Sequence, residues 1–167
     1  NMNQHEKIFN KTLQYYQNTL RKKGSDFYFF RPADVAEGRR YSTTVKPCDF
    51  WFFDEVFVAL EMKYTSSDRI RQSQIKAHQM KSLEHFDKFK SRSYLILTLK
   101  FNPKLTIKNS PTFAVPIRNA SNWFEKSKRS FFLGEEKKWK GYQLEWLNPL
   151  KIFNIDPIVA PSCRLFK

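Results

Sequence analysis

The chain has 167 residues, of which 41% are hydrophobic and 17% aromatic, so it is long and apolar enough to form one domain with its own core. This composition excludes a disordered chain. No apolar run approaches the roughly 18 residues that a membrane-spanning helix needs. The 30 lysines and arginines exceed the 16 acidic residues and give a net charge of +14. Such a charge favours a polyanionic partner, most commonly a nucleic acid.

Several metal and cofactor motifs are missing from the sequence. None of its four glycines stands in a Walker-type or dinucleotide-binding loop, and neither an HExxH motif nor paired cysteines with zinc spacing occurs. The two cysteines, Cys48 and Cys163, and the lack of an amino-terminal signal pattern predict free thiols in a reducing compartment. We therefore expect a cytoplasmic protein with no membrane partner.

The first predicted element is a helix over residues 4–22, followed by Gly24, because apolar residues recur at three- and four-residue steps. A short aromatic strand is expected over 27–30. The segment from Ala33 to Lys46 is polar and irregular. Two strands over 48–53 and 56–64 then flank an acidic turn, and the second of them lacks alternation, which is typical of a central strand buried on both faces.

In the second half of the chain, Asp68 is a candidate N-cap for a helix that runs to about Lys90. Strands are expected over 93–99 and 113–117, and a short helix over 120–126. The aromatic and lysine-rich segment from Phe131 onward fits no element. The order helix, strand, strand, strand, helix, strand predicts an α/β (α+β) fold with a central mixed sheet flanked by helices. We expect a single domain over 1–167, with its core over 4–125 and a C-terminal extension over 126–167.

Three polar residues stand where core packing does not favour them: Asp49 begins one strand of the expected hairpin, and Glu61 and Lys63 end the other. Residues two apart in a strand share a face, so Glu61 and Lys63 project together. A buried carboxylate and ammonium cost several kcal/mol of desolvation unless partners compensate. A divalent cation would relieve the repulsion between two carboxylates facing each other across the hairpin. The other interpretation, an ordinary Glu-Lys pair at a strand end, stays open.

This constellation suits phosphodiester hydrolysis. Asp49 and Glu61 would hold Mg²⁺ through oxygen ligands, and Lys63 would orient the attacking water and offset the charge on phosphorus. The pairing requires a particular register, because a two-residue turn at 54–55 would point Asp49 away from Glu61. A three-residue loop over 54–56, or a bulge, places residue 53 opposite 57 and Asp49 opposite Glu61.

Two further residues are candidates for supporting roles. Gln79 lies on the apolar stripe of the second helix and needs hydrogen-bond partners, which the site or the nearby backbone would supply. Glu6 on the first helix either adds a third carboxylate or is solvated. His78 and His85 are expected to be surface or packing residues. The basic residues that we expect to bind DNA are Arg39, Arg40, Lys46, Arg69 and Arg71.

At these positions the sequence resembles the PD-(D/E)xK nuclease superfamily and, within it, the RecU-type Holliday junction resolvases. The resemblance covers roughly residues 4–125. The matching pieces are Glu6, Ser42-Thr43-Thr44 ahead of Asp49, Glu61-x-Lys63 with Tyr64-Thr65, Gln74-Ile75, His78-Gln79, Tyr94-Leu95-Ile96 and Phe113-Ala114-Val115-Pro116.

The resemblance implies a restriction-endonuclease-like core and a homodimeric, Mg²⁺-dependent endonuclease, bacterial or phage-encoded, that nicks four-way DNA junctions symmetrically; Mn²⁺ would substitute for Mg²⁺. It makes Asp49, Glu61 and Lys63 catalytic, with Glu6 and Gln79 supporting. The chain lacks the family's glycine- and arginine-rich start, and its segment 32–44 is shorter than the family's stalk. A restriction-like or repair nuclease and a non-catalytic nucleic-acid-binding protein are the alternatives.

The C-terminal aromatics bear on the expected dimer. Phe131, Phe132, Trp139 and Trp146 lie in a lysine-rich segment. They either form a subunit interface, as a two-fold symmetric dimer would require, or pack across the back of the sheet. The sequence leaves both possibilities open.

Overall fold

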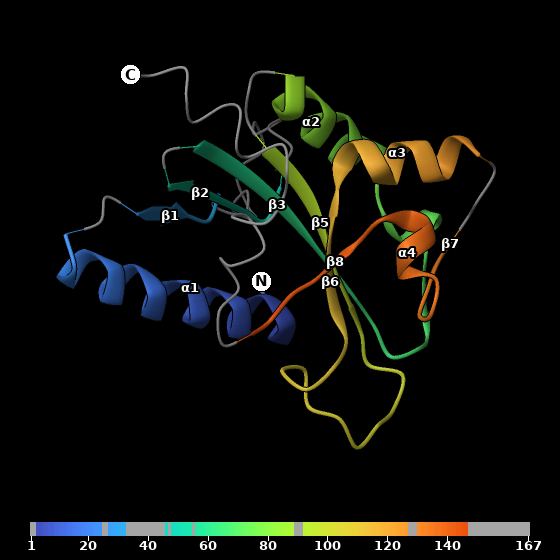
Figure 1. Cartoon of the computed structure of the whole chain (residues 1–167), viewed down its shortest axis with the longest axis horizontal. Coiled ribbons are helices and arrows are strands. Elements are labelled where there is room, and N and C mark those ends of the chain that lie inside the picture. The colour runs from blue at the N-terminus through green and yellow to red at the C-terminus, as the bar shows by residue number, and fades with distance from the viewer. Residues whose placement is uncertain are drawn as a thin grey trace, which may run out of the picture.

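A six-stranded mixed sheet forms the centre of the computed structural model, with the strand order β1-β2-β3-β5-β6-β8 (Figure 1). The structure describes residues 3–24, 27–32, 46, 48–54, 56–88, 92–126 and 130–146. The strands of this sheet are β1 (Tyr28–Phe30), β2 (Phe50–Asp54), β3 (Val56–Thr65), β5 (Arg92–Leu99), β6 (Thr112–Pro116) and β8 (Tyr142–Gln143). The expected mixed sheet with flanking helices is therefore confirmed.

The helices cover both faces of this sheet. Helix α1 lies against one face, and α2 and α3 lie against the other (Figure 1). Their bounds, with those of the short helix α4, are α1 (Gln4–Lys22), α2 (Ala77–Lys88), α3 (Ile117–Glu125) and α4 (Glu136–Trp139). In the described part of the chain, no helix combines the length and the apolar character needed to cross a membrane.

Helix α1 follows the expected span of 4–22. At its start the Asn3 side chain accepts a hydrogen bond from the backbone N–H of Glu6 at 2.9 Å, which satisfies one of the free donors of the first turn. Gly24 follows its end with a φ of 79°, a left-handed conformation that glycine adopts without steric cost. Phe9 and Leu13 are fully buried on the face turned to the sheet.

Strands β2 and β3 form the predicted hairpin, and the register that the site requires is present. Phe53 lies opposite Phe57 and Phe50 opposite Leu60, so Asp49, one residue before β2, falls at the level of Glu61. β3 then pairs in parallel with β5, and every residue of β5 is buried. The prediction that β3 is a central strand is confirmed.

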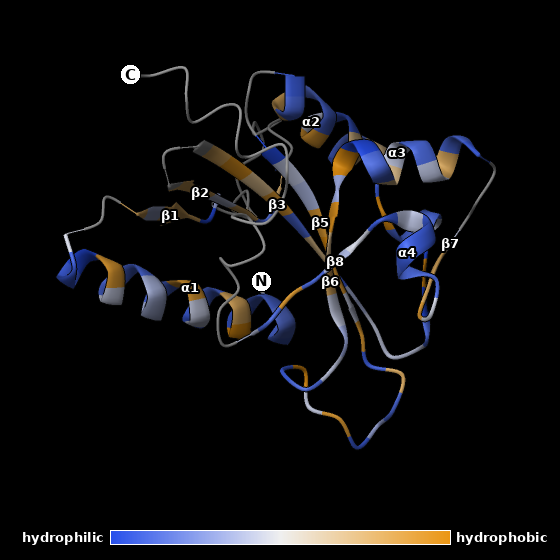
Figure 2. Ribbon diagram, viewed as in Figure 1, coloured by the Kyte–Doolittle hydropathy of each residue, from blue (hydrophilic) through white to orange (hydrophobic). Residues whose placement is uncertain are grey.

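Two hydrophobic clusters lie on opposite faces of the sheet. The cluster under α1 includes Phe9, Leu60 and Ile96, and the cluster under α2 and α3 includes Leu83 and Leu95. Figure 2 shows the same division, with hydrophobic residues along the central strands and hydrophilic ones on the outer sides of the helices. The alternation along β5 places the odd and even residues in different clusters, as the two-residue period of a strand requires.

The prediction that Asp68 caps a helix is wrong. The segment after β3 instead forms a short strand β4 (Arg69–Arg71) and a single 3-10 turn η1 (Gln72–Gln74), and α2 begins only at Ala77. β4 pairs antiparallel with β7 (Ser130–Phe132), so that Ile70 faces Phe131. This second, two-stranded sheet joins segments far apart in the sequence, which no local pattern could indicate.

The segment beyond residue 126 contributes to both hydrophobic clusters. Phe131, Trp139 and Trp146 are buried in the core, whereas Phe132 is 36% exposed. For those first three side chains the packing alternative is confirmed, and they are not available for a dimer interface. Cys48 is a free, buried thiol, and Cys163 lies outside the described residues.

Candidate active site

Asp49 and Glu61 lie side by side at the open end of the β2–β3 hairpin. Both are buried, with 7% and 2% of their surface exposed. The backbone N–H of Asp49 donates to the carbonyl of Leu60 at 2.9 Å, and Asp49 Oδ2 accepts from the backbone N–H of Met62 at 2.8 Å. The hairpin itself therefore fixes the position of the Asp49 carboxylate.

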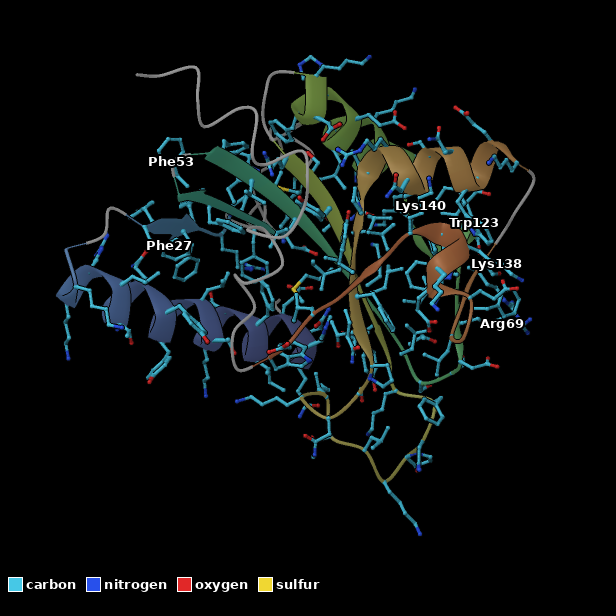
Figure 3. The ribbon with its side chains drawn as sticks, viewed as in Figure 1. Phe27, Phe53, Arg69, Trp123, Lys138 and Lys140 are labelled. Atoms are coloured by element: carbon cyan, nitrogen blue, oxygen red, sulfur yellow. The ribbon has the colours of Figure 1, made fainter. Side chains whose placement is uncertain are left out.

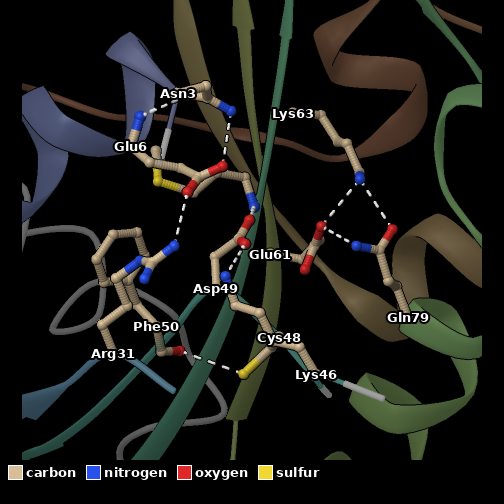
Figure 4. A network of polar contacts seen from close by, with 11 residues as sticks. Asn3, Glu6, Arg31, Lys46, Cys48, Asp49, Phe50, Glu61, Lys63 and Gln79 are labelled. Carbon is tan, nitrogen blue, oxygen red and sulfur yellow. Dashed lines mark hydrogen bonds and ion pairs between the residues drawn. The ribbon is translucent and has the colours of Figure 1, made fainter. Parts of the chain in front are cut away.

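Lys63 and Gln79 clamp one oxygen of Glu61. Lys63 Nζ lies 2.9 Å from Glu61 Oε1, as expected for two residues on one face of a strand. Gln79 Oε1 accepts from Lys63 Nζ at 2.8 Å, and its amide Nε2 donates to Glu61 Oε1 (Figure 4). Gln79 also accepts from the backbone N–H of Lys76 at 3.1 Å. Both kinds of partner considered for Gln79, the site and the backbone, are thus present.

Lys46 holds the second carboxylate. Its Nζ lies 2.8 Å from Asp49 Oδ1, and 19% of the lysine side chain is exposed. Burial alone would lower the pKa of Lys46, but the hydrogen bond and the charge of Asp49 outweigh it, and the pKa is raised. Lys46, expected at the DNA surface, therefore lies in the carboxylate site, where it compensates the charge of Asp49.

The second oxygen of Glu61 has no donor. Oε2 is buried and lacks a hydrogen-bond partner among the described residues. Burial, and then the nearby charge of Asp49, raise the pKa of Glu61 to about 7, although Lys63 acts in the opposite direction. A buried anionic oxygen without a donor costs several kcal/mol. Because carboxylate oxygens are the ligands that Mg²⁺ prefers, the unpartnered Oε2 and the neighbouring Asp49 fit such an ion.

A cavity of about 490 Å³ opens in front of these groups. Its walls come from the start of α1, the end of β3 and the segment that leads into α2. The polar side chains that line it include those of Asn3, Glu6, Asp49, Glu61, Lys63 and Gln79. The space is sufficient for an ion, its water ligands and part of an extended substrate.

Glu6 faces the same cavity but belongs to a separate group. Its Oε1 accepts from Asn3 Nδ2 at 2.6 Å, and its Oε2 lies 3.3 Å from Arg31. Burial, followed by the charge of Asp49, raises the pKa of Glu6. Among the described residues, no three His, Cys, Asp or Glu side chains come close enough to hold one metal ion together. The Glu6 carboxylate is therefore bonded to Asn3 and paired with Arg31 beside the cavity, and whether it supports a metal ion is still a prediction.

The remaining predicted residues lie apart from the carboxylates. Arg69 and Arg71 are exposed on β4, and His78 and His85 are exposed on α2, as expected for surface residues. Arg39 and Arg40, the other cations predicted to bind DNA, lie outside the described residues.

A buried chain of neutral hydrogen bonds beside the cavity escaped the sequence analysis. The Thr112 hydroxyl donates to the carbonyl of Ser110 at 3.1 Å, so it accepts from Trp146 Nε1 and from the Thr98 hydroxyl. Thr98 therefore accepts from His5 Nε2, at 2.8 Å. His5 is 3% exposed, and its Nδ1 has no partner among the described residues.

This chain joins α1, β5, β6 and the segment after β8. Burial lowers the pKa of His5 to about 4, against the opposing influence of Asp49, so the ring is neutral near pH 7. The available signal in the sequence was Thr98, a polar residue that follows the apolar run over 94–97 of the strand. The position of its partner His5, 93 residues earlier, could not be read from it.

Comparisons with known proteins give a distant structural likeness. No family model matches the chain, and no curated protein does. Among solved structures, the chain is similar to Hjc of Archaeoglobus fulgidus, a Holliday junction resolvase from an archaeal hyperthermophile. The identity is 17%, the match covers 64% of this chain and 77% of that chain, and the TM-score is 0.37. A likeness at this level leaves the chemistry to be argued from the side chains themselves.

Proposed function

We propose that this chain is a divalent-metal-dependent endonuclease that hydrolyses phosphodiester bonds in DNA. The observation that supports this most directly is the buried pair Asp49 and Glu61 at a large cavity, where Glu61 Oε2 has no donor within the described part of the chain. A structural role does not explain an arrangement in which two carboxylates raise each other's free energy. Replacing both by apolar residues would remove the desolvation cost.

Asp49 and Glu61 would hold Mg²⁺, with Mn²⁺ as a substitute. When bound, the ion supplies charge stabilisation for the transition state and lowers the pKa of water. Lys46 and Lys63 balance the carboxylates, each through an ion pair shorter than 3 Å. Lys63, held by Gln79, places its ammonium where a non-bridging phosphate oxygen can accept a hydrogen bond as negative charge develops.

The charge of the chain supports a nucleic acid as substrate. With a net charge of +14, phosphate contacts would supply most of the affinity. Arg69 and Arg71 are exposed on β4, and the chain runs from there through η1 into the cavity wall at Gln74 and Lys76. A DNA backbone contacted by β4 would therefore reach the carboxylates along one continuous surface.

We further propose a four-way junction as the preferred DNA and a two-fold symmetric homodimer as the acting species. This finer proposal rests on the motif resemblance over residues 4–125. Two opposed strands of a junction need two active sites related by a matching axis. Paired symmetric nicks and a dimer in sedimentation are expected. If the chain is a monomer and cleaves linear and junction DNA at equal rates, the junction-resolvase proposal is wrong, and a less selective nuclease is the better description.

The test of the activity is cleavage of labelled four-way, three-way and linear DNA in different divalent ions. Mg²⁺ and Mn²⁺ should support turnover. Ca²⁺ should support binding with little turnover, because it prefers larger and looser oxygen sites. Undiminished cleavage in excess chelator would contradict the metal hypothesis. Asp49→Asn should abolish cleavage while DNA affinity stays near or above that of the wild type, since affinity comes from dispersed cations.

A further inference from the structure

A second, smaller cavity lies between α3 and α4, on a part of the chain that the proposed active site does not use. Its volume is about 50 Å³, roughly a tenth of the catalytic cavity. Asn119, Asn122 and Lys126 line it from α3 and its C-cap, and Lys138 and Lys140 line it from α4 and its C-cap. We call these five residues the lysine pocket. Figure 3 shows Lys138 and Lys140 near Trp123, on the side of the molecule that also carries Arg69.

Most donors of the lysine pocket are not engaged. Among the described residues, the side chains of Asn122, Lys126 and Lys140 have no hydrogen-bond or ion-pair partner. Lys138 pairs with Glu135 at 2.7 Å, but these side chains are 67% and 33% exposed. An ion pair so open to water contributes little and exchanges readily with another anion. The pocket thus presents several cationic and amide donors to one small volume.

Two largely buried tryptophans, Trp123 and Trp139, also line the pocket. Trp123 Nε1 donates to the carbonyl of Ser130 at 2.9 Å, and Trp139 Nε1 donates to the carbonyl of Phe132 at 3.1 Å. Both indole N–H groups are therefore used within the protein, and the rings serve as walls.

The backbone at Lys140 is held in an unusual conformation. Its φ of 53° lies in the left-handed region, which costs a residue with a side chain about 1 kcal/mol or more. The Asn119 side chain donates to the carbonyl of Lys140 at 3.2 Å and so secures this turn from α3. Lys140 is the C-cap residue of α4, and a left-handed residue commonly ends a helix. The Lys140 side chain at this position lines the pocket.

Contacts connect the lysine pocket to the catalytic cavity. Trp139, in the wall of the pocket, bonds to Phe132 of β7, and the guanidinium of Arg69 lies 5.8 Å from the ring of Phe132. Arg69 begins β4, which leads through η1 to Gln74 and the cavity. The β4–β7 ribbon, which carries Arg69, therefore lies between the pocket and the segment that leads to the cavity.

We propose that the lysine pocket binds a backbone phosphate of a nucleic-acid arm, away from the phosphate that is cut. The donors are lysine ammoniums and a side-chain amide, which are suited to phosphate oxygens. The small volume suits one phosphate group rather than a base between stacking rings. This inference rests on the proposed nuclease function, which it deepens by adding a second point of contact on the DNA.

The experiment measures binding of the full chain to duplex arms of increasing length, in Ca²⁺ so that no strand is cut. The test variant is Lys126→Ala/Lys138→Ala/Lys140→Ala. The slope of log affinity against log salt concentration should fall by about 1 for each phosphate that the variant no longer neutralises. Affinity for long arms should fall at least about tenfold. Below the arm length that reaches the pocket, the variant and the wild type should bind equally.

The matched control is Lys11→Ala/Lys22→Ala/Lys23→Ala, which removes the same charge from exposed positions on α1 and its C-cap. This control should change the slope by less than the test variant does. Two outcomes would overturn the inference. One is an equal salt slope for the two triple variants, and the other is a loss of DNA affinity in the test variant that is the same at every arm length. If the wild type cleaves DNA and the test variant binds DNA normally, then the lysine pocket does not bind a phosphate, and the proposed nuclease function is unaffected. A chain that neither binds nor cleaves DNA would overturn the proposed function itself.

Discussion

Two polar groups beside the large cavity differ in charge, although each contains one atom without a hydrogen-bond partner among the described residues, Glu61 Oε2 in the first and His5 Nδ1 in the second. The first comprises Asp49, Glu61, Lys46, Lys63 and Gln79, with carboxylates at 2.8–2.9 Å from lysines. The second runs from His5 through two threonines to a tryptophan and is neutral throughout. Glu61 and Lys63 of the first group lie on β3, and Thr98 of the second lies on the neighbouring strand β5.

The difference agrees with the proposal that the first group serves catalysis and the second serves stability. Neutral hydrogen bonds in a buried chain each contribute roughly 1 kcal/mol, and they join elements distant in the sequence. Adjacent carboxylates destabilise the fold, and a raised pKa at Glu61 is a measure of that. Perturbed carboxyl groups at a cavity are typical of active sites. The first group should therefore respond in activity and the second in stability.

The largest expected effect is on cleavage by Glu61→Gln. Loss of a metal ligand should reduce the rate by more than about a thousandfold, or roughly 4 kcal/mol of transition-state stabilisation. Its stability at pH 8 should equal or exceed that of the wild type. The folded pKa of about 7 lies above the ordinary 4.5, so ionisation of Glu61 destabilises the fold as the pH rises through 7.

The control for that variant is Thr98→Val, which alters the second group and should keep the cleavage rate within about threefold of the wild type, well under 1 kcal/mol of transition-state stabilisation. The measurement is single-turnover cleavage at saturating Mg²⁺. If Glu61→Gln and Thr98→Val lose the same amount of cleavage activity, the two groups do not differ in their importance for catalysis.

The next effect is the pH dependence of stability that His5 imposes. Its pKa in the folded chain, about 4, lies below the ordinary 6.5. The stability that neutral His5 contributes is complete above about pH 6.5 and is lost as the pH falls toward 4, by up to about 3 kcal/mol. His5→Gln keeps an amide donor for Thr98 and does not titrate.

The free-energy difference between wild type and His5→Gln should therefore decrease from pH 7 to pH 4. Denaturant unfolding at several pH values measures it, and the subtraction cancels the opposite contribution of Glu61. A difference that is constant with pH would show that His5 is as accessible to protons in the folded chain as in the unfolded one.

Thr98→Val tests the cost of breaking the neutral chain. The valine leaves His5 Nε2 without its acceptor, and Thr112 loses a donor. An unpartnered buried donor costs about 1–3 kcal/mol, so the free energy of unfolding should fall by about 2 kcal/mol. Thermal unfolding at pH 7 measures the change. An unchanged midpoint would mean that these hydrogen bonds contribute nothing net.

The same contrast explains what the sequence could reveal. The charged group consists of residues that interrupt strong local patterns: Glu61 and Lys63 end an apolar strand, and Gln79 interrupts an apolar helix stripe. Buried polar groups in such places need a reason. The sequence left the hairpin register open between an even and an odd loop, and the structure has the register that the site requires. The position of these residues in one polar group was thus predictable from local sequence, and their proposed role in catalysis is still a prediction.

The rest of the fold depends on contacts that local patterns do not encode. β4 has three residues, of which only Ile70 is buried, and its partner Phe131 lies 61 positions away in the register. Asp68 looked like a helix cap because the β4–η1 segment carries no strand signal of its own. Lys46 as a partner of Asp49, and His5 as a partner of Thr98, depend on how separate elements pack.

The smallest expected effect is that of Gln79→Ala, which sharpens the boundary of the charged group. Lys63 and Glu61 remain paired without the amide, so cleavage should continue, reduced about tenfold, or roughly 1.4 kcal/mol. Gln79 donates to the ionised form of Glu61, and removing that donor should raise the pKa of Glu61 further. Because protons compete with the metal for Glu61, the midpoint of the cleavage–pH curve should move upward. Raising the Mg²⁺ concentration should restore part of the rate. If the cleavage rate falls but the midpoint of the cleavage–pH curve does not move, Gln79 only packs against the site. The charged group would then consist of the two carboxylates and their lysines, without Gln79.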